Sequence, residues 1–296
     1  ANSLIWYLKN IFYPAIGRIN QRVISLIPET AKEQEPLIHL GFWPGGDRDG
    51  NPFVVPSTTF EVIKNLRANL IECYLEDIEL LQKRLTFKNV DNLIIKIEKS
   101  IKSLGATNEN IYTKELLLSD LLQVRQIMIT EHESLFLELV DSFIAKVQSF
   151  GFYFASLDIR QDSAVHREVI DQLLPFLCTD IENYSGLPDD QKTIFLLSIP
   201  EFKKEPELDF SSLGYDCYHT IRLIKEIQQL SGELACHRYI ISQCDSIQNV
   251  LEVFFLIRTI WRSEKISIDI VPLFEKVQDL QNAGQTMHFM YLNTLF

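Results

Sequence analysis

A short charged loop carries the densest set of chemically useful residues in the chain. It lies in the segment LGFWPGGDRDGNPF (40–53), and its hexapeptide GGDRDG uses three of the chain's 11 glycines. Glycine permits positive φ angles and close approach of the backbone to a neighbour. Asp47, Arg48 and Asp49 place two carboxylates and one guanidinium side by side. Two roles stay open for them: contact with a ligand, or an internal ion-paired brace that positions neighbouring residues.

Two further charged residues have types that suit phosphate and metal chemistry. Arg160 follows the apolar segment YFASLDI, and a guanidinium can bind phosphate oxygens in a bidentate manner while remaining charged. Glu275 follows the apolar segment SIDIVPLF, and a carboxylate is a ligand that Mg²⁺ and Mn²⁺ prefer. The structural alternatives are an ion pair of Arg160 within the protein, with Asp158 as a candidate partner, and a simple helix N-terminal charge at Glu275.

Several better-known site motifs do not match the chain. The loop fails as an EF-hand because Gly50 is misplaced and Thr58 stands where the last carboxylate ligand is needed. It also lacks the Gly-Lys-Ser/Thr of a phosphate-binding Walker loop. His166 could act as a base, but a lone histidine beside Asp162 and Arg167 is more often structural.

Short apolar segments must position these residues. Each is β-branched or aromatic and too short for an independent helix, which favours strands. Predicted helices separate them, so we expect parallel pairing, with polar residues collected at the carboxyl ends of the strands. Polar or charged residues do follow each one. The predicted strands are 37–43, 153–160, 238–242 and 267–274.

Most of the remaining chain has helical periodicity. In 57–85, for example, apolar residues recur at steps of three and four. Thr130 and Glu133 have the spacing of a capping box before the apolar run 135–140. The proline-containing segment 199–211 is predicted to be a flexible loop. The other predicted helices are 1–26, 91–104, 109–130, 132–149, 162–177, 187–198, 212–231, 245–263 and 273–283.

Composition is that of a globular protein able to form a sizeable core. Apolar residues make up 46% of the 296 residues, and the net charge of −12 argues against non-specific nucleic-acid binding. No apolar run approaches the roughly 18 residues of a membrane span, and no secretory signal is evident. Five cysteines without metal-ligand spacing favour free thiols in the cytoplasm. Both ends of the sequence suggest that it was cut from a longer chain.

Four segments together resemble the phosphoenolpyruvate carboxylase family. The first is similar to the family's W-M-G-G-D-R-D-G-N-P signature, with Pro44 in place of methionine. The second is similar to L-D-I-R-Q-E-S-x-x-H, with Asp162 in place of glutamate. All four occur in the family's order, and together they span residues 42–283 of the 296 residues. They are FWPGGDRDGNP (42–52), LDIRQDSAVHREVID (157–171), YIISQCDSIQNVLEV (239–253) and IVPLFEKVQDLQNA (270–283).

The resemblance implies roles for individual residues. It implies that Arg160 contacts the substrate phosphate and that Glu275 is a ligand of Mg²⁺ or Mn²⁺, together with an aspartate from a motif that this chain lacks. It also implies that Trp43 and Trp6 line an apolar pocket for CO₂, although aromatic core packing is the alternative. Asp47, Arg48 and Asp49 would lie at the rim of the same site.

The resemblance also implies a fold and a reaction. The expected fold is predominantly α with a few parallel strands, as part of a (β/α)₈ barrel with helical elaborations. Residues 1–296 would be one incomplete domain from the middle of a longer enzyme. The enzyme would convert phosphoenolpyruvate and bicarbonate to oxaloacetate and phosphate as a cytoplasmic homo-oligomer, a tetramer, that supplies the citric acid cycle. The chain alone is expected to be inactive. The alternative is a non-catalytic helical interaction module derived from the same scaffold.

Overall fold

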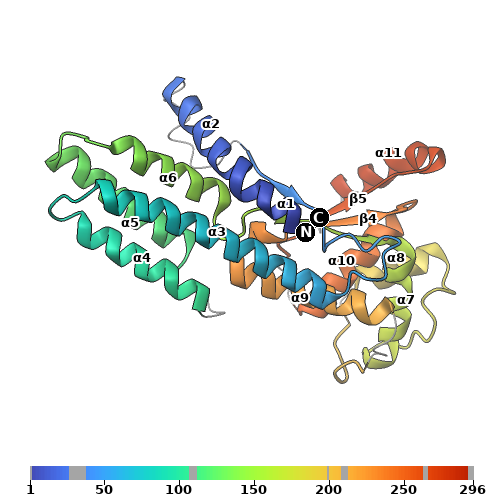
Figure 1. Ribbon diagram of the computed structural model, residues 1–296. Helices are drawn as coiled ribbons and strands as arrows, with labels where there is room; N and C mark the ends of the chain where they lie inside the picture. Colours follow the sequence, from blue (N-terminus) through green and yellow to red (C-terminus); the bar gives the residue numbers. More distant parts are fainter. Residues whose placement is uncertain are drawn as a thin grey trace. The chain divides into compact units, whose positions relative to one another are not determined.

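The computed structural model describes residues 2–26, 38–106, 112–198, 200–207, 213–262 and 266–292. The chain forms two compact units (Figure 1). Unit 1 comprises Ala1–Phe42, Glu61–Ser156 and Ile227–Ala235. Unit 2 comprises Trp43–Phe60, Leu157–Glu226 and Cys236–Phe296. Of the loop predicted at 199–211, residues 199 and 208–211 lie outside the described part.

Unit 1 is built mainly from helices. The long helix α3 shows why: Ile63, Leu66, Leu70 and Tyr74 recur at helical spacing, and all are buried. Helix α6 packs along both α2 and α5. The elements are α1 (Asn2–Tyr7), the π-helical segment η1 (Leu8–Phe12), α2 (Tyr13–Leu26), β1 (Gly41–Phe42), α3 (Pro56–Arg84, which begins in unit 2), α4 (Asp91–Ala106), α5 (Lys114–Glu131), α6 (Leu137–Phe150) and the 3₁₀ turn η4 (Glu233–Ala235).

An aromatic cluster forms the centre of unit 1. The ring of Tyr13 stacks on Phe150 at 5.3 Å, and Tyr74 meets Phe143 edge-on at 5.4 Å. The hydroxyl of each buried tyrosine is satisfied: Tyr13 donates to Asp77, and Tyr74 donates to the Gly151 carbonyl at 2.7 Å. Aromatic packing with paired hydroxyls therefore holds the helices of this unit together.

The predicted capping box at Thr130 and Glu133 is wrong. The hydroxyl of Thr130 donates to the Gln126 carbonyl inside α5. The φ angles of Glu133, Ser134 and Phe136 are positive, at 51°, 60° and 58°. Helix α6 begins only at Leu137. A turn of left-handed residues, rather than a side-chain cap, therefore separates α5 from α6.

Unit 2 contains a three-stranded parallel sheet in the order β3-β4-β5. The predicted parallel pairing is confirmed: Ile159 lies opposite Tyr239, and Tyr239 lies opposite Ile270. Helix α10 is buried along nearly its whole length and packs against α7, α8, β5 and α11. The elements are β3 (Ile159–Asp162), α7 (Ser163–Leu173), η3 (Leu174–Phe176), α8 (Asp189–Leu197), α9 (Leu213–Ser231, which ends in unit 1), β4 (Arg238–Ser242), α10 (Ile247–Trp261), β5 (Asp269–Pro272) and α11 (Val277–Leu292).

The predicted strand at 153–160 is broken into two. Phe154 has a positive φ of 66°, and the extended residues form β2 (Ser156–Leu157) and then β3. Strand β2 pairs with β1, whereas β3 pairs with β4. Arg160 is therefore the second residue of β3 rather than, as predicted, the last residue of a strand. None of the helices in the described part of the chain is long and apolar enough to cross a lipid bilayer.

Candidate functional site

The GGDRDG loop lies directly against β3 of the same unit. The backbone N–H of Arg160 donates to the Gly46 carbonyl at 3.0 Å, and the N–H of Arg48 donates back to the Arg160 carbonyl at 3.0 Å. A Cβ atom added to Gly46 would lie 2.0 Å from the carbonyl oxygen of Asp158. Glycine is therefore required at this position because the two backbones approach too closely for any side chain.

The side chain of Arg160 is surrounded by carboxylates from two distant segments. One terminal nitrogen, Nη2, donates to Asp49 Oδ2 at 2.7 Å and to Glu275 Oε1 at 3.0 Å. A third carboxylate, Asp47, has Oδ1 3.9 Å from Nε, which is an ion-pair distance rather than a hydrogen bond. Arg160 is thus held in ion pairs within the protein, but Asp158 is not one of its partners, because Asp158 pairs with Arg238 at 2.7 Å.

Glu275 is held at the carboxyl end of the sheet, three residues after β5. Its Oε2 accepts a hydrogen bond from the backbone N–H of Gln243 at 3.1 Å. Gln243 follows β4 with a φ of 51°, and its side-chain amide donates to Asp162 at the end of β3. The ends of three parallel strands thus meet through Asp162, Gln243 and Glu275, as the sequence predicted for polar residues at strand ends.

Chemically, this cluster pairs one guanidinium with an excess of carboxylate groups. Asp47, Asp49 and Glu275 are each partly exposed, between 23% and 35% for the side chain, and Arg160 is 18% exposed. A guanidinium this accessible can exchange a carboxylate partner for the oxygens of an incoming anion. The arrangement therefore suits recognition of a phosphate or carboxylate.

Arg48 forms no ion pair with Asp47 or Asp49, which pair with Arg160 instead, so the expected salt-bridged brace among these three residues is wrong. Its side chain is buried, and its Nη2 donates to the hydroxyl of Thr59 at 2.7 Å. The same hydroxyl donates to the Gly45 carbonyl at 2.7 Å. Burial lowers the pKa of Arg48 from its ordinary value. Arg48 therefore anchors the loop to the start of α3 from inside the protein and does not reach the carboxylate cluster.

The two tryptophans occupy different environments. The ring of Trp43 lies 5.9 Å from the guanidinium carbon of Arg160, a cation–π distance, and 51% of the residue is exposed. Trp6 lies in α1 of unit 1, where 56% of it is exposed and its ring meets Tyr7 edge-on. Within unit 2 the structure thus brings Trp43 to the Arg160 cluster, whereas Trp6 belongs to unit 1. Neither tryptophan is buried in a core.

The predicted metal ligand Glu275 has suitable donor chemistry, but the described residues around it do not form a complete set of metal ligands. Among the described residues, no group of three or more histidine, cysteine, aspartate or glutamate side chains is arranged to hold a metal ion. Both Glu275 oxygens accept hydrogen bonds, one from Arg160 and one from Gln243. Glu275 fits as a single carboxylate ligand, and a complete site needs further ligands beyond those described.

His166 is a structural residue of the core. It is fully buried, and its Nε2 is 2.9 Å from the hydroxyl of Tyr239. Burial lowers the pKa of His166 to about 3, so the imidazole is neutral at physiological pH. It lies in the buried core of unit 2 rather than among the partly exposed carboxylates around Arg160, so it is not placed to act there as a base.

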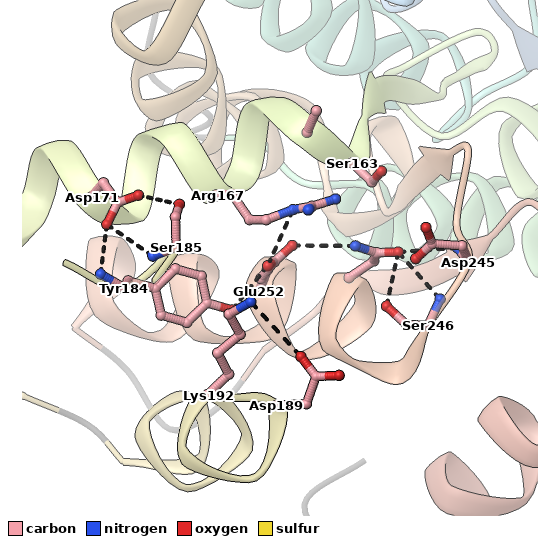
Figure 2. A network of polar contacts seen from close by, with 12 residues as sticks. Ser163, Arg167, Asp171, Tyr184, Ser185, Asp189, Lys192, Asp245, Ser246 and Glu252 are labelled. Carbon is pink, nitrogen blue, oxygen red and sulfur yellow. Dashed lines mark hydrogen bonds and ion pairs between the residues drawn. The ribbon is translucent and has the colours of Figure 1, made fainter. Parts of the chain in front are cut away.

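A second polar network in unit 2 was not anticipated from the sequence. Figure 2 shows Arg167 of α7 and the Tyr184 side chain converging on Glu252, which lies in α10. Tyr184 donates to Glu252 Oε1 at 2.9 Å, and Arg167 Nε is 3.7 Å from the same oxygen. Glu252 is 1% exposed, and burial raises its pKa to about 7. The available signal was a lone glutamate within the apolar run VLEVFFLI.

Glu252 is expected to make folding depend on pH. Between its ordinary pKa of 4.5 and the raised value of about 7, the folded protein retains a proton that the unfolded chain has lost. The contribution of Glu252 to the free energy of unfolding is therefore largest below pH 4.5. It falls by about 3 kcal/mol as the pH rises to 7. We expect Glu252→Gln to remove that dependence. The measurement is chemical denaturation of wild type and variant at several pH values.

The control for Glu252 is Glu79→Gln, which removes an exposed carboxylate paired with Lys83 at 2.6 Å. The difference in unfolding free energy between wild type and Glu252→Gln should change across pH 4.5 to 7. The corresponding difference for Glu79→Gln should stay within about 0.5 kcal/mol. A constant difference for Glu252→Gln would contradict a raised pKa at this position.

Comparison with known proteins identifies the family. The sequence model of the family described as phosphoenolpyruvate carboxylase matches residues 2–103 and 95–296. Phosphoenolpyruvate carboxylases of Synechococcus sp. and Trichormus variabilis are 25% and 26% identical, each over 96% of this chain. That of Parasynechococcus marenigrum is 22% identical over 100% of the chain. The chain spans about a third of the length of these relatives.

The family match covers the GGDRDG loop, β3 with Arg160, and the segment with Glu275. These are the elements that form the carboxylate cluster around Arg160. The chain therefore belongs to the phosphoenolpyruvate carboxylase family.

Proposed function

We propose that this chain supplies part of the active site of a phosphoenolpyruvate carboxylase, which converts phosphoenolpyruvate and bicarbonate to oxaloacetate and phosphate. The observation that carries the proposal is the position of Arg160. Its guanidinium lies at the carboxyl end of a parallel sheet, and its partners Asp49 and Glu275 come from two separate family segments. A guanidinium held in this way can bind the phosphate group of the substrate bidentately.

The other residues have proposed roles around Arg160. Glu275 supplies one ligand for Mg²⁺ or Mn²⁺, and the remaining ligands come from outside the described residues. When bound, the ion supplies positive charge that stabilises a developing enolate oxygen. Trp43 contributes an apolar wall beside Arg160 that excludes water and favours retention of CO₂. The family resemblance assigns the same role to Trp6. Asp47 and Arg48 hold the loop in place.

The proposed fold and assembly are those of a larger enzyme. Strands β3, β4 and β5 would be consecutive members of a (β/α)₈ barrel, with residues 1–296 as an incomplete central domain and 199–211 as a flexible loop. Three paired strands cannot close a barrel, and so we expect the chain alone to be inactive. The complete enzyme would be a cytoplasmic homotetramer that supplies oxaloacetate to the citric acid cycle.

The test is bicarbonate-dependent formation of oxaloacetate from phosphoenolpyruvate with Mg²⁺, measured for the complete protein that contains this sequence and for residues 1–296 alone. Activity in the complete protein supports a carboxylase. No activity in a folded, Mg²⁺-supplied complete protein would refute the proposal and favour the non-catalytic interaction module.

A change at Glu275 tests the metal role independently of turnover. Glu275→Gln removes one anionic ligand and is expected to weaken Mn²⁺ binding at least about tenfold, because even indirect partners of a metal contribute that much. The measurement is Mn²⁺ titration of the complete protein followed by electron paramagnetic resonance. Glu233→Gln, a change in the η4 turn, is the control and should bind Mn²⁺ as wild type does. Equal affinity of Glu275→Gln and wild type would remove Glu275 from the metal site.

A further inference from the structure

Asp49 and Glu275 both contact Nη2 of Arg160, but they are held differently. Glu275 follows β5 in a stretch without helix or strand, and the proposed function requires its oxygens for a metal ion. Asp49 lies in the GGDRDG loop, which is fixed to β3 by backbone hydrogen bonds in both directions at Arg160. If Glu275 held a metal ion, Asp49 would be the carboxylate that remains on Arg160.

The loop restrains the backbone of Asp49 from several sides. The backbone N–H of Asp49 donates to Asp47 Oδ1 at 3.2 Å, which closes a tight turn. Gly50 follows with a φ of 67° and allows the chain to reverse. Arg48 anchors the loop to Thr59. Asp49 is thus held within a preorganised turn before it contacts Arg160.

We propose that Asp49 is a positioning residue that fixes the guanidinium plane of Arg160 for the substrate phosphate; this inference rests on the proposed function. A guanidinium has five N–H donors, so one bond to Asp49 leaves the others for phosphate oxygens. Without Asp49, the flexible arginine side chain must be ordered by the substrate itself, which weakens binding. The role of the GGDRDG loop is then to carry one carboxylate to Arg160 at a fixed angle.

The experiment is steady-state kinetics of the complete protein with Asp49→Asn, which keeps the size of the side chain and removes its charge. We expect the KM for phosphoenolpyruvate to rise about tenfold, the range for loss of a charge-assisted hydrogen bond, with a smaller change in the KM for bicarbonate. Asp49→Glu restores a carboxylate and should recover part of this loss. Asp141→Asn breaks another Arg–Asp pair, with Arg125 at 2.6 Å, and should leave both KM values unchanged.

A double-mutant cycle separates positioning from a merely structural role. If Asp49 acts through Arg160, Asp49→Asn should add little to the loss already caused by Arg160→Lys. Additive losses with an equally lowered melting temperature would indicate a structural role and overturn the inference. An unchanged KM for Asp49→Asn in an active enzyme would overturn it while leaving the carboxylase function intact. No activity in the wild type would overturn both.

Discussion

Arg160→Lys in the complete protein is expected to lower kcat/KM for phosphoenolpyruvate by about two orders of magnitude, because a hydrogen bond between charged groups contributes about 1.5–3 kcal/mol. Arginine contacts Asp49 and Glu275 through one nitrogen and still has other donors for phosphate. Lysine is a point charge with three donors on one nitrogen and cannot span these partners and a phosphate in one plane. The measurement is initial rate against phosphoenolpyruvate at saturating bicarbonate.

Arg125→Lys is the matched control for this change. Arg125 also pairs with an aspartate, Asp141, at 2.6 Å, but it lies on α5 in unit 1. Its replacement should leave kcat/KM within about twofold of wild type, because exposed ion pairs contribute little to stability. An unchanged KM for phosphoenolpyruvate in Arg160→Lys would remove Arg160 from the phosphate site.

Gly46→Ala is expected to destabilise unit 2 by about 3 kcal/mol, at the upper end of the range for overpacking a closely packed site. The added Cβ would lie 2.0 Å from the Asp158 carbonyl oxygen and 3.2 Å from Leu157 Cγ. The first of these is a backbone atom, so no change of rotamer relieves the clash. The loop must move away from β3 and lose its hydrogen bonds with Arg160.

The control for Gly46→Ala is Gly284→Ala in α11. A Cβ at Gly284 meets nothing within 4 Å, and alanine is the better helix former by about 1 kcal/mol. Gly284→Ala should therefore leave stability unchanged or raise it slightly. Guanidinium denaturation of the complete protein measures both variants. Wild-type stability together with a wild-type KM in Gly46→Ala would show that the loop does not require its close approach to β3.

Local sequence patterns were sufficient to predict the type and bounds of some helices and strands. The apolar spacing in α3 predicted a helix over 57–85, and the structure has one at Pro56–Arg84. The strand at 238–242 matches β4 residue for residue. The break in 153–160 could not be predicted in this way, because the left-handed Phe154 is a fully buried apolar residue with no local turn signal.

Long-range partners account for most of what the sequence could not predict. Thr130 and Glu133 have the spacing of a cap, yet left-handed residues between α5 and α6 use that segment as a turn. Glu252 is an ordinary glutamate in the sequence, and only its burial against Tyr184 raises its pKa. Hydrophobicity along the chain does not reveal which polar groups meet inside a fold.

The sequence by itself determined the family and the residue types of the site, because its four motifs occur in the family's order between residues 42 and 283. The tertiary structure decided which of those residues meet. Asp49 and Glu275 are separated from Arg160 by 111 and 115 positions, and they reach one nitrogen of it because the loop and the strand ends meet at one edge of the sheet. Arg48, between two site aspartates in the sequence, turns inward to Thr59 instead. Backbone direction in a tight turn decides that difference, and residue types alone do not encode it.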